Sequence, residues 1–152
     1  MKETIPKAPL WLGLAGLLPF IWGAASHANP NLAAWGTNWA GIGFVGLAIQ
    51  TTYGAVILSF MSGVLWGFAT KTHGRTAAWC YVLSVSPALW AFFLMSSSTV
   101  QTGPYLIAGF LGLFALDIVF VQLQLTPNWW LRLRLLLTAI VLTCLLPPLW
   151  LT

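Results

Sequence analysis

The chain has 152 residues, of which 59% are hydrophobic and only 5% are charged. This composition excludes an ordinary soluble domain, and the length is that of a single domain. The net charge of +4 does not indicate nucleic-acid binding, because the basic residues fall at the ends of apolar runs, where topology and lipid headgroups account for them. Membrane lipids, and no nucleic acid, are therefore the expected partners.

Five apolar runs predict an all-α integral membrane bundle of five transmembrane helices, with residues 1–152 forming one transmembrane domain. The first predicted span covers residues 9–25, and Pro19 is expected to kink it.

The second apolar run, residues 39–68, is interrupted at Gln50 and has the length of one long helix or two short ones. A single crossing is favoured, because two crossings would place Lys71 and Arg75 on the opposite side from the other basic residues. Several glycines precede Gln50, so residues 39–50 are interpreted as a re-entrant or interfacial start of this span.

The remaining spans are predicted at residues 78–95, 104–124 and 131–150, and Pro87 is expected to kink the first of these. Successive connections then carry two basic residues or none, in alternation. Under the positive-inside rule the N-terminus is cytoplasmic and the C-terminus lies outside. All six basic residues fall on the cytoplasmic side: Lys2, Lys7, Lys71, Arg75, Arg132 and Arg134.

Asp117 is the acidic residue of the fourth predicted span, and the other acid of the chain is Glu3. An ionisable group inside the membrane costs roughly 2.5–3.5 kcal/mol on translocon scales, so a partner or a function is expected. Asp117 lies about 10 Å below the cytoplasmic end of its span, within reach of Arg134 on the fifth span. Arg132 is the other candidate partner. The favoured interpretation is a structural ion pair, and the alternative is a proton-accepting carboxylate in a transport path.

Small residues recur at four-residue spacing in the second span, at Ser59, Gly63 and Gly67. Such stripes let helix backbones approach closely. Packing inside the monomer is the favoured interpretation, and contact with a second copy or with a partner's helix is the alternative.

The ten tryptophans of the chain divide between the two ends of the predicted spans. This distribution is typical of the aromatic belts of membrane proteins. In the alternative interpretation, aromatic side chains stack on a flat apolar ligand such as a tetrapyrrole or a quinone. The candidate lining residues are then Tyr53, Trp66, Trp129 and Trp130.

No catalytic constellation is found in the sequence. His27 and His73 fall on opposite sides of the predicted membrane, so they cannot jointly hold a haem. The sequence has no Cys/His cluster, carboxylate pair or phosphate-binding glycine loop. We therefore expect a non-enzymatic protein with no metal site and no resident cofactor, although a bound lipid, quinone or pigment stays an open alternative.

Three segments resemble a family of small bacterial and mitochondrial membrane proteins of unknown function that includes eukaryotic transmembrane protein 69. The resemblance implies a five-span membrane protein and no established activity. The family pattern would place a second glycine where Ser62 stands and a polar or basic residue where Leu65 stands. The segments are PLWLGLAGLLPF at residues 9–20, YGAVILSF at 53–60 with Gly63 and Trp66-Gly67, and PNWWLRLR at 127–134 with Thr138.

Two functions follow as hypotheses. The first is an accessory or assembly subunit that packs against a larger membrane complex, which requires other integral membrane proteins as partners. The second is a binder or carrier of a small lipophilic ligand (quinone, tetrapyrrole or lipid), or a proton-coupled transporter that uses Asp117. A short chain without an Arg- and Ser-rich leader predicts a multi-pass protein of the bacterial inner membrane. A polar pocket near Asp117 would favour the second function, and an open small-residue face the first.

Overall fold

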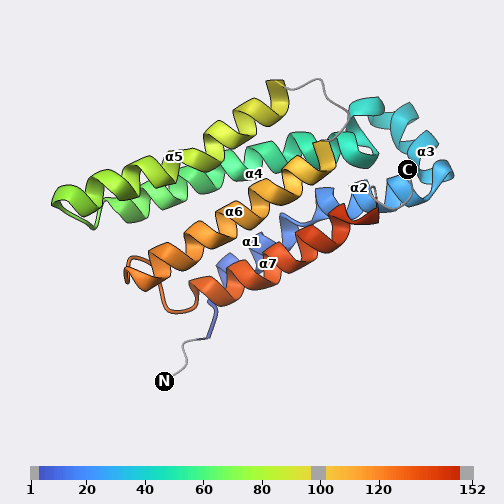
Figure 1. The fold of residues 1–152 in the computed structure, drawn as a ribbon. Helices are drawn as coiled ribbons and strands as arrows, with labels where there is room; N and C mark the ends of the chain where they lie inside the picture. Colours follow the sequence, from blue (N-terminus) through green and yellow to red (C-terminus); the bar gives the residue numbers. More distant parts are fainter. Residues whose placement is uncertain (1–3, 97–101, 148–152) are drawn as a thin grey trace.

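The computed structural model describes residues 4–96 and 102–147, and every regular element in these residues is helical, as predicted (Figure 1). The elements in chain order are α1 (Lys7–Ala15), α2 (Leu18–Ala28), α3 (Pro30–Ala40), the 3-10 turn η1 (Ile42–Phe44), α4 (Gly46–Ala69), α5 (Gly74–Ser96), α6 (Thr102–Gln122) and α7 (Trp130–Leu145).

Four helical segments in the described part of the chain have the length and hydropathy to cross a membrane. They are α1 together with α2, then α4, α5 and α6. The 16 residues of α7 span about 24 Å, which is less than the hydrocarbon core of about 30 Å. The predicted end of the fifth span, at residue 150, lies outside the described residues.

The first apolar segment is broken between α1 and α2. The amide of Gly16 donates to Leu12 O and that of Leu17 donates to Leu14 O, so the last turn of α1 tightens and stops there. Pro19 lies in the first turn of α2, where a residue without an N–H is tolerated. Pro19, which was predicted to kink the span, thus lies just after the break between α1 and α2.

The segment predicted as a re-entrant or interfacial start, residues 39–50, divides between three elements. It includes the end of α3, the turn η1 and the first residues of α4, which begins at Gly46. Ser26 Oγ on α2 accepts a hydrogen bond from the Gly46 amide at 2.9 Å and so caps α4. Gln50 lies inside α4 and is fully buried, so the polar break in the apolar run does not interrupt the helix.

The long helices pack around α4 (Figure 1). α4 contacts α5, α2 and α6, whereas α7 contacts α6, α2 and α1. Gly54 lets α4 approach α6 closely, since a Cβ at this position would lie 2.7 Å from Leu106 Cδ1. The buried core between these helices is mostly large and apolar, with Phe20, Leu58, Leu65, Leu106, Phe110, Leu113, Phe120 and Leu145.

The basic residues of the described chain gather at one end of the bundle. The start of α1, the turn between α4 and α5 and the start of α7 all lie there (Figure 1). Lys71 Nζ donates to Leu125 O at 2.8 Å, which joins the α4–α5 turn to the α6–α7 loop. Lys7, Arg75 and Arg132 belong to the same helix ends.

Candidate functional site

Asp117 and Arg134 form a buried ion pair between α6 and α7. Arg134 Nε lies 2.6 Å from Asp117 Oδ2, and the side chains are 7% and 0% exposed respectively. Trp130 Nε1 donates to the other carboxylate oxygen, Oδ1, at 2.8 Å. Both oxygens of the carboxylate are therefore held by donors from α7. A charged group buried inside an apolar bundle requires partners of this kind.

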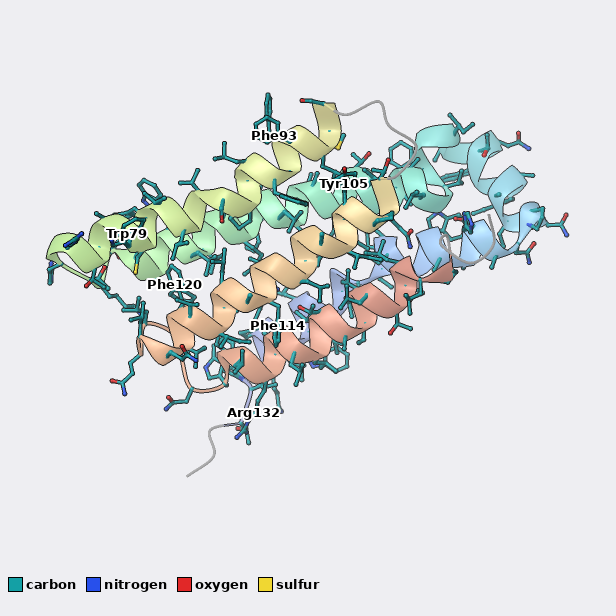
Figure 2. All side chains as sticks on the ribbon, viewed as in Figure 1. Trp79, Phe93, Tyr105, Phe114, Phe120 and Arg132 are labelled. Atoms are coloured by element: carbon teal, nitrogen blue, oxygen red, sulfur yellow. The ribbon has the colours of Figure 1, made fainter. Side chains whose placement is uncertain are left out.

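Arg134 rather than Arg132 is the partner of Asp117. Arg132 is exposed at the base of α7 (Figure 2), because residues two positions apart do not share a helix face. Trp130 lies one turn before Arg134, so both donors reach the same carboxylate.

Two polar atoms of α7 are buried next to the ion pair without a hydrogen-bond partner, namely Arg134 Nη2 and Thr138 Oγ1. Both residues are about one twentieth exposed, at 5% and 4%. Thr138 follows Arg134 by one turn, so the two side chains lie on the same face. A buried donor without a partner costs about 1–3 kcal/mol, so these two atoms reduce the stability of the fold at this point.

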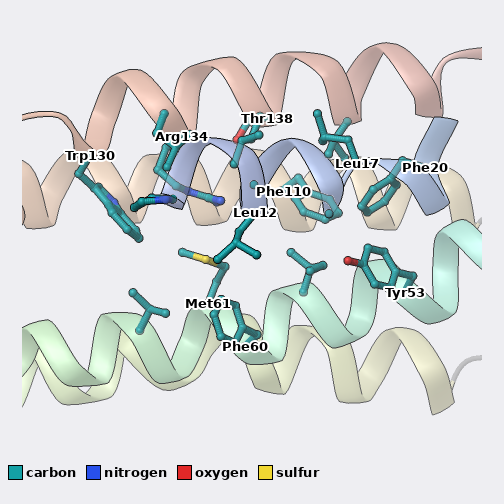
Figure 3. A pocket seen from close by; sticks show the side chains of 18 residues that line it. Leu12, Leu17, Phe20, Tyr53, Phe60, Met61, Phe110, Trp130, Arg134 and Thr138 are labelled. Carbon is teal, nitrogen blue, oxygen red and sulfur yellow. The ribbon is translucent and has the colours of Figure 1, made fainter. Parts of the chain in front are cut away.

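Arg134 and Thr138 also belong to the lining of a cavity of about 380 Å³ within the bundle (Figure 3). Its walls are almost entirely apolar and come from α1, α2, α4, α6 and α7. Arg134 is the charged residue of the lining, and the Tyr53 hydroxyl points into the space from α4 (Figure 3). The other lining residues include Gly13, Leu17, Phe20, Ile57, Met61, Val64, Phe110, Leu137 and Val141.

Helices α1 and α4 both contribute to the lining of the cavity. Helix α1 packs mainly against α7, whereas α4 packs against α2, α5 and α6. Leu12 of α1 and Phe60 of α4 belong to the lining and are 74% and 64% exposed. Part of the lining is therefore also on the apolar outer surface of the bundle.

The predicted lining residues separate into two pairs. Tyr53 and Trp130 line the cavity. Trp66 and Trp129 are absent from the described lining, and Trp66 instead packs its ring against Tyr81, with centroids 4.6 Å apart. Trp129 lies beside Trp130, at 6.0 Å between ring centroids.

The stripe of Ser59, Gly63 and Gly67 lies on the outer surface of α4. All three residues are exposed, and a Cβ at either glycine would meet nothing within 4 Å. The favoured prediction of packing inside the monomer is therefore wrong. Its physical reason is that the larger residues on the other face, such as Leu58 and Leu65, fill the bundle interior instead.

Gln50 and Thr138 are polar residues of this region to which the sequence analysis assigned no role. Gln50 Nε2 donates to Phe20 O at 3.0 Å and to Cys144 O at 2.9 Å, so it ties α4 to α2 and α7. In the sequence, Gln50 and Thr138 could each have been noticed as a polar residue within an apolar helix. For Thr138, the one-turn spacing from Arg134 was a second signal.

No group of His, Cys, Asp and Glu side chains in the described residues could hold a metal ion. The site thus consists of an ion pair, two unpartnered polar atoms and an apolar cavity. Such an arrangement can bind a lipophilic molecule that has a polar group at one point.

Comparison with known proteins identifies the family. The chain is 34% identical to transmembrane protein 69 of Xenopus tropicalis over 142 residues, which cover 91% of this chain and 52% of the relative. It is 33% identical to transmembrane protein 69 of Mus musculus over 141 residues, covering 89% and 52%. The chain therefore spans about half the length of these curated relatives. No solved structure matches it.

The model of a protein family of unknown function, DUF3429, matches residues 5–149, which is nearly the whole chain. The family resemblance seen in the three sequence segments is thereby confirmed. With its long apolar helices, the chain is a multi-pass membrane protein. It belongs to the DUF3429 family, together with transmembrane protein 69.

Proposed function

We propose that this protein binds a small lipophilic molecule inside its helical bundle and holds or carries it without changing it chemically. One observation supports this proposal above the others. The cavity of about 380 Å³ has almost entirely apolar walls, with the charged residue Arg134 and the Tyr53 hydroxyl among them (Figure 3). Its volume falls in the range of about 300–1,000 Å³ that is typical of small-molecule sites.

The ion pair fixes the one charged side chain of the lining. Asp117 holds the guanidinium of Arg134 through Nε. The Tyr53 hydroxyl points into the cavity (Figure 3) and could bond a polar group of the ligand. The apolar remainder of the ligand would gain about 25 cal/mol for each Å² of surface removed from water.

The same geometry supports a structural role for Asp117 more than a proton-carrying one. Both carboxylate oxygens accept hydrogen bonds, from Trp130 and from Arg134. The carboxylate is fully buried, and the lining of the cavity does not include it. We therefore propose that Asp117 positions Arg134 rather than relays protons.

A second candidate function is that of an accessory or assembly subunit packed against a larger membrane complex. It is supported by the open stripe on α4, since a Cβ added at Gly63 or Gly67 would meet nothing within 4 Å in the described chain. Glycine inside a helix costs about 0.5–1 kcal/mol relative to alanine. Contact with a helix of another membrane protein would explain glycine at these positions, because glycine lets the two helix backbones approach closely.

We also propose the five-span topology, with α7 as the last crossing. The gathering of Lys7, Lys71, Arg75 and Arg132 at one end supports a cytoplasmic N-terminus and an external C-terminus. The bacterial inner membrane is the proposed location.

The test is purification of the tagged protein from its native membrane in a mild detergent, followed by mass spectrometry of small molecules and proteins. A stoichiometric lipophilic molecule supports the first function, and a stoichiometric set of larger membrane subunits supports the second. A preparation that contains neither would count against both. A bound molecule that leaves the protein chemically altered would contradict the non-enzymatic role.

A further inference from the structure

We infer that the ligand is a single-chain lipophile that lies lengthwise in the bundle and bonds its uncharged polar group to the Tyr53 hydroxyl. This inference rests on the proposed ligand-binding function and specifies the class of its ligand. Three properties of the cavity carry it: the length, the width and the position of the polar side chains.

The cavity is long in the direction of the helices. Its lining follows three segments of the chain: Pro9 to Phe20, Tyr53 to Val64 and Trp130 to Val141. At a rise of about 1.5 Å per residue, the segments on the unbroken helices α4 and α7 are each about 16 Å long. Trp130 and Tyr53 accordingly lie at opposite ends of the lining (Figure 3). A ligand that fills the cavity is therefore elongated and runs parallel to the helices.

The cavity is also narrow. A volume of about 380 Å³ spread over about 16 Å leaves a mean cross-section of about 24 Å². Such a cross-section matches the packing of one extended chain, since extended polypeptide chains in a sheet lie about 4.8 Å apart. The cavity thus accommodates one alkyl or isoprenoid chain lengthwise, whereas a macrocycle such as a tetrapyrrole is too wide for it.

The Tyr53 hydroxyl is the polar group available to the ligand at one end of the cavity. It points into the space (Figure 3), and Tyr53 keeps part of its surface accessible. No hydrogen bond joins this hydroxyl to another described residue. A Cβ at Gly16 would lie 3.5 Å from the Tyr53 oxygen, so the hydroxyl lies beside the break between α1 and α2. A phenolic hydroxyl both donates and accepts, so it can bond a hydroxyl or a carbonyl of the ligand.

The position of Tyr53 favours an uncharged head group. Tyr53 lies about 10 Å from the start of α4 at Gly46, at a rise of about 1.5 Å per residue. An ionised group at such a depth in the membrane requires a partner of opposite charge. Arg134, the charged residue of the lining, lies toward the other end of the cavity and is already paired with Asp117 at 2.6 Å. A hydroxyl or carbonyl head needs no such partner.

Two kinds of lipid-soluble molecule combine one chain with an uncharged polar head, namely a long-chain alcohol and a quinone with an alkyl tail. An extended chain advances about 1.2 Å per bond, so about fourteen carbons fill the length of the cavity. The probes are therefore tetradecanol and a decyl-substituted benzoquinone. Two comparison probes each change one property: tetradecanoate is the anion with the same chain, and cholesterol is an alcohol with fused rings.

The experiment measures photocrosslinking of tritiated tetradecanol, with a diazirine at the far end of its chain, to the full chain in lipid nanodiscs. Unlabelled probes compete with it, and mass spectrometry locates the crosslinks. We expect crosslinks near Pro9 and Trp130, at the end of the lining opposite Tyr53. Tetradecanol, the quinone or both should displace the label at lower concentrations than tetradecanoate or cholesterol.

A pair of variants tests the head group contact. Tyr53→Phe removes the hydroxyl and keeps the ring, which packs edge-on against Phe20 with centroids 5.6 Å apart. Tyr105→Phe is the matched control, because Tyr105 is exposed on α6 and lies outside the described lining. We expect Tyr53→Phe to raise the concentration needed for half-displacement about threefold to tenfold. The control should stay within about twofold, as expected of an exposed site.

Thermal unfolding of the same variants provides a second readout. Tyr53→Phe should unfold at the temperature of the wild type, since the hydroxyl has no partner in the described chain. A loss of affinity without a loss of stability would therefore arise from the missing bond to the ligand and not from damage to the fold.

The outcomes separate the inference from the function on which it rests. Displacement by tetradecanol, by the quinone or by both supports a neutral single-chain ligand and identifies its source. Stronger displacement by tetradecanoate or by cholesterol overturns the inference but keeps the ligand-binding function. Crosslinks of the far-end diazirine beside Tyr53, or an affinity that Tyr53→Phe leaves unchanged, also overturn it.

Two further results concern probes that do not bind. If no probe binds but another lipophile accompanies the native protein, the inference fails and the proposed function stands. If no probe binds and no lipophile accompanies the native protein, the proposed function itself fails.

Discussion

Arg134 bonds Asp117 through Nε at 2.6 Å, while its Nη2 remains buried without a partner. The ion pair therefore uses Nε of the guanidinium, and the Arg134 side chain also belongs to the lining of the cavity. Trp130 donates to the other carboxylate oxygen at 2.8 Å, so both oxygens of Asp117 accept a hydrogen bond from α7. The pair thus joins α6 to α7 beside the cavity.

Breaking the pair from the acidic side should destabilise the protein. Asp117→Asn leaves the Arg134 charge buried without its counter-ion, and we expect a loss of about 3–5 kcal/mol in the free energy of unfolding. The double variant Asp117→Leu with Arg134→Met should recover much of this loss, because it removes both charges. Chemical unfolding in detergent micelles checks both. An Asp117→Asn protein as stable as the wild type would contradict the structural role and reopen the proton-carrying one.

Close packing of α2 on α4 predicts an effect at Gly23. A Cβ there would overlap Gln50 Cγ and lie 2.8 Å from Gly46 O, and the second neighbour is backbone. We expect Gly23→Ala to cost about 1–3 kcal/mol, as overpacked positions do. Gly112→Ala on α6 is the matched control, because nothing lies within 4 Å of a Cβ at that position. The account of this contact would be wrong if both variants unfolded at the same denaturant concentration.

The outer face of α4 provides a test of the accessory role. Gly63→Leu adds a side chain where nothing in the described chain lies within 4 Å, so the free energy of unfolding should change by less than about 0.5 kcal/mol. If a partner helix packs here, the larger side chain should remove the complex from native gels of solubilised membranes. Val82→Leu, at an exposed position of α5, is the control. Unchanged folding with an unchanged complex would leave the stripe without a role in assembly.

The proposed orientation predicts opposite labelling of two exposed positions. His73 lies in the turn between α4 and α5, at the basic end, and Asn31 begins α3 near the other end. Cells that carry His73→Cys should resist a membrane-impermeant thiol reagent until they are lysed, whereas Asn31→Cys should react in intact cells. The reverse pattern would invert the topology. Equal labelling of both positions would contradict a single membrane crossing between Asn31 and His73.

The sequence predicted the parts of the fold that depend on regular geometry. The depth of Asp117 could be matched to that of Arg134 because helix rise per residue is constant. The direction of the small-residue stripe could not be predicted in this way. Its period shows that Ser59, Gly63 and Gly67 share a face, but neighbouring side chains decide whether that face is inside. In this bundle the larger Leu58 and Leu65 occupy the interior.

The cavity could not be predicted, because it depends on how several helices meet. It lies beside α1, which is broken from α2 at Gly16 and packs mainly on α7. The sequence signals at Thr138 do not reveal its hydrogen bonding, since a threonine in an apolar helix commonly bonds to its own backbone, as Thr143 does. Its exceptional state, buried without a partner, is visible only in three dimensions.

The central claim is that the cavity holds a lipophilic molecule. Its most direct test is the molar ratio of bound lipophile to protein, measured by mass spectrometry after purification from native membranes. We predict a near-stoichiometric ratio for the wild type and for Thr143→Phe, at an exposed position of α7, and a severalfold lower ratio for Thr138→Phe, whose larger side chain would occupy part of the cavity that Thr138 lines. Equal ratios in all three proteins, or no bound lipophile in any, would contradict the claim.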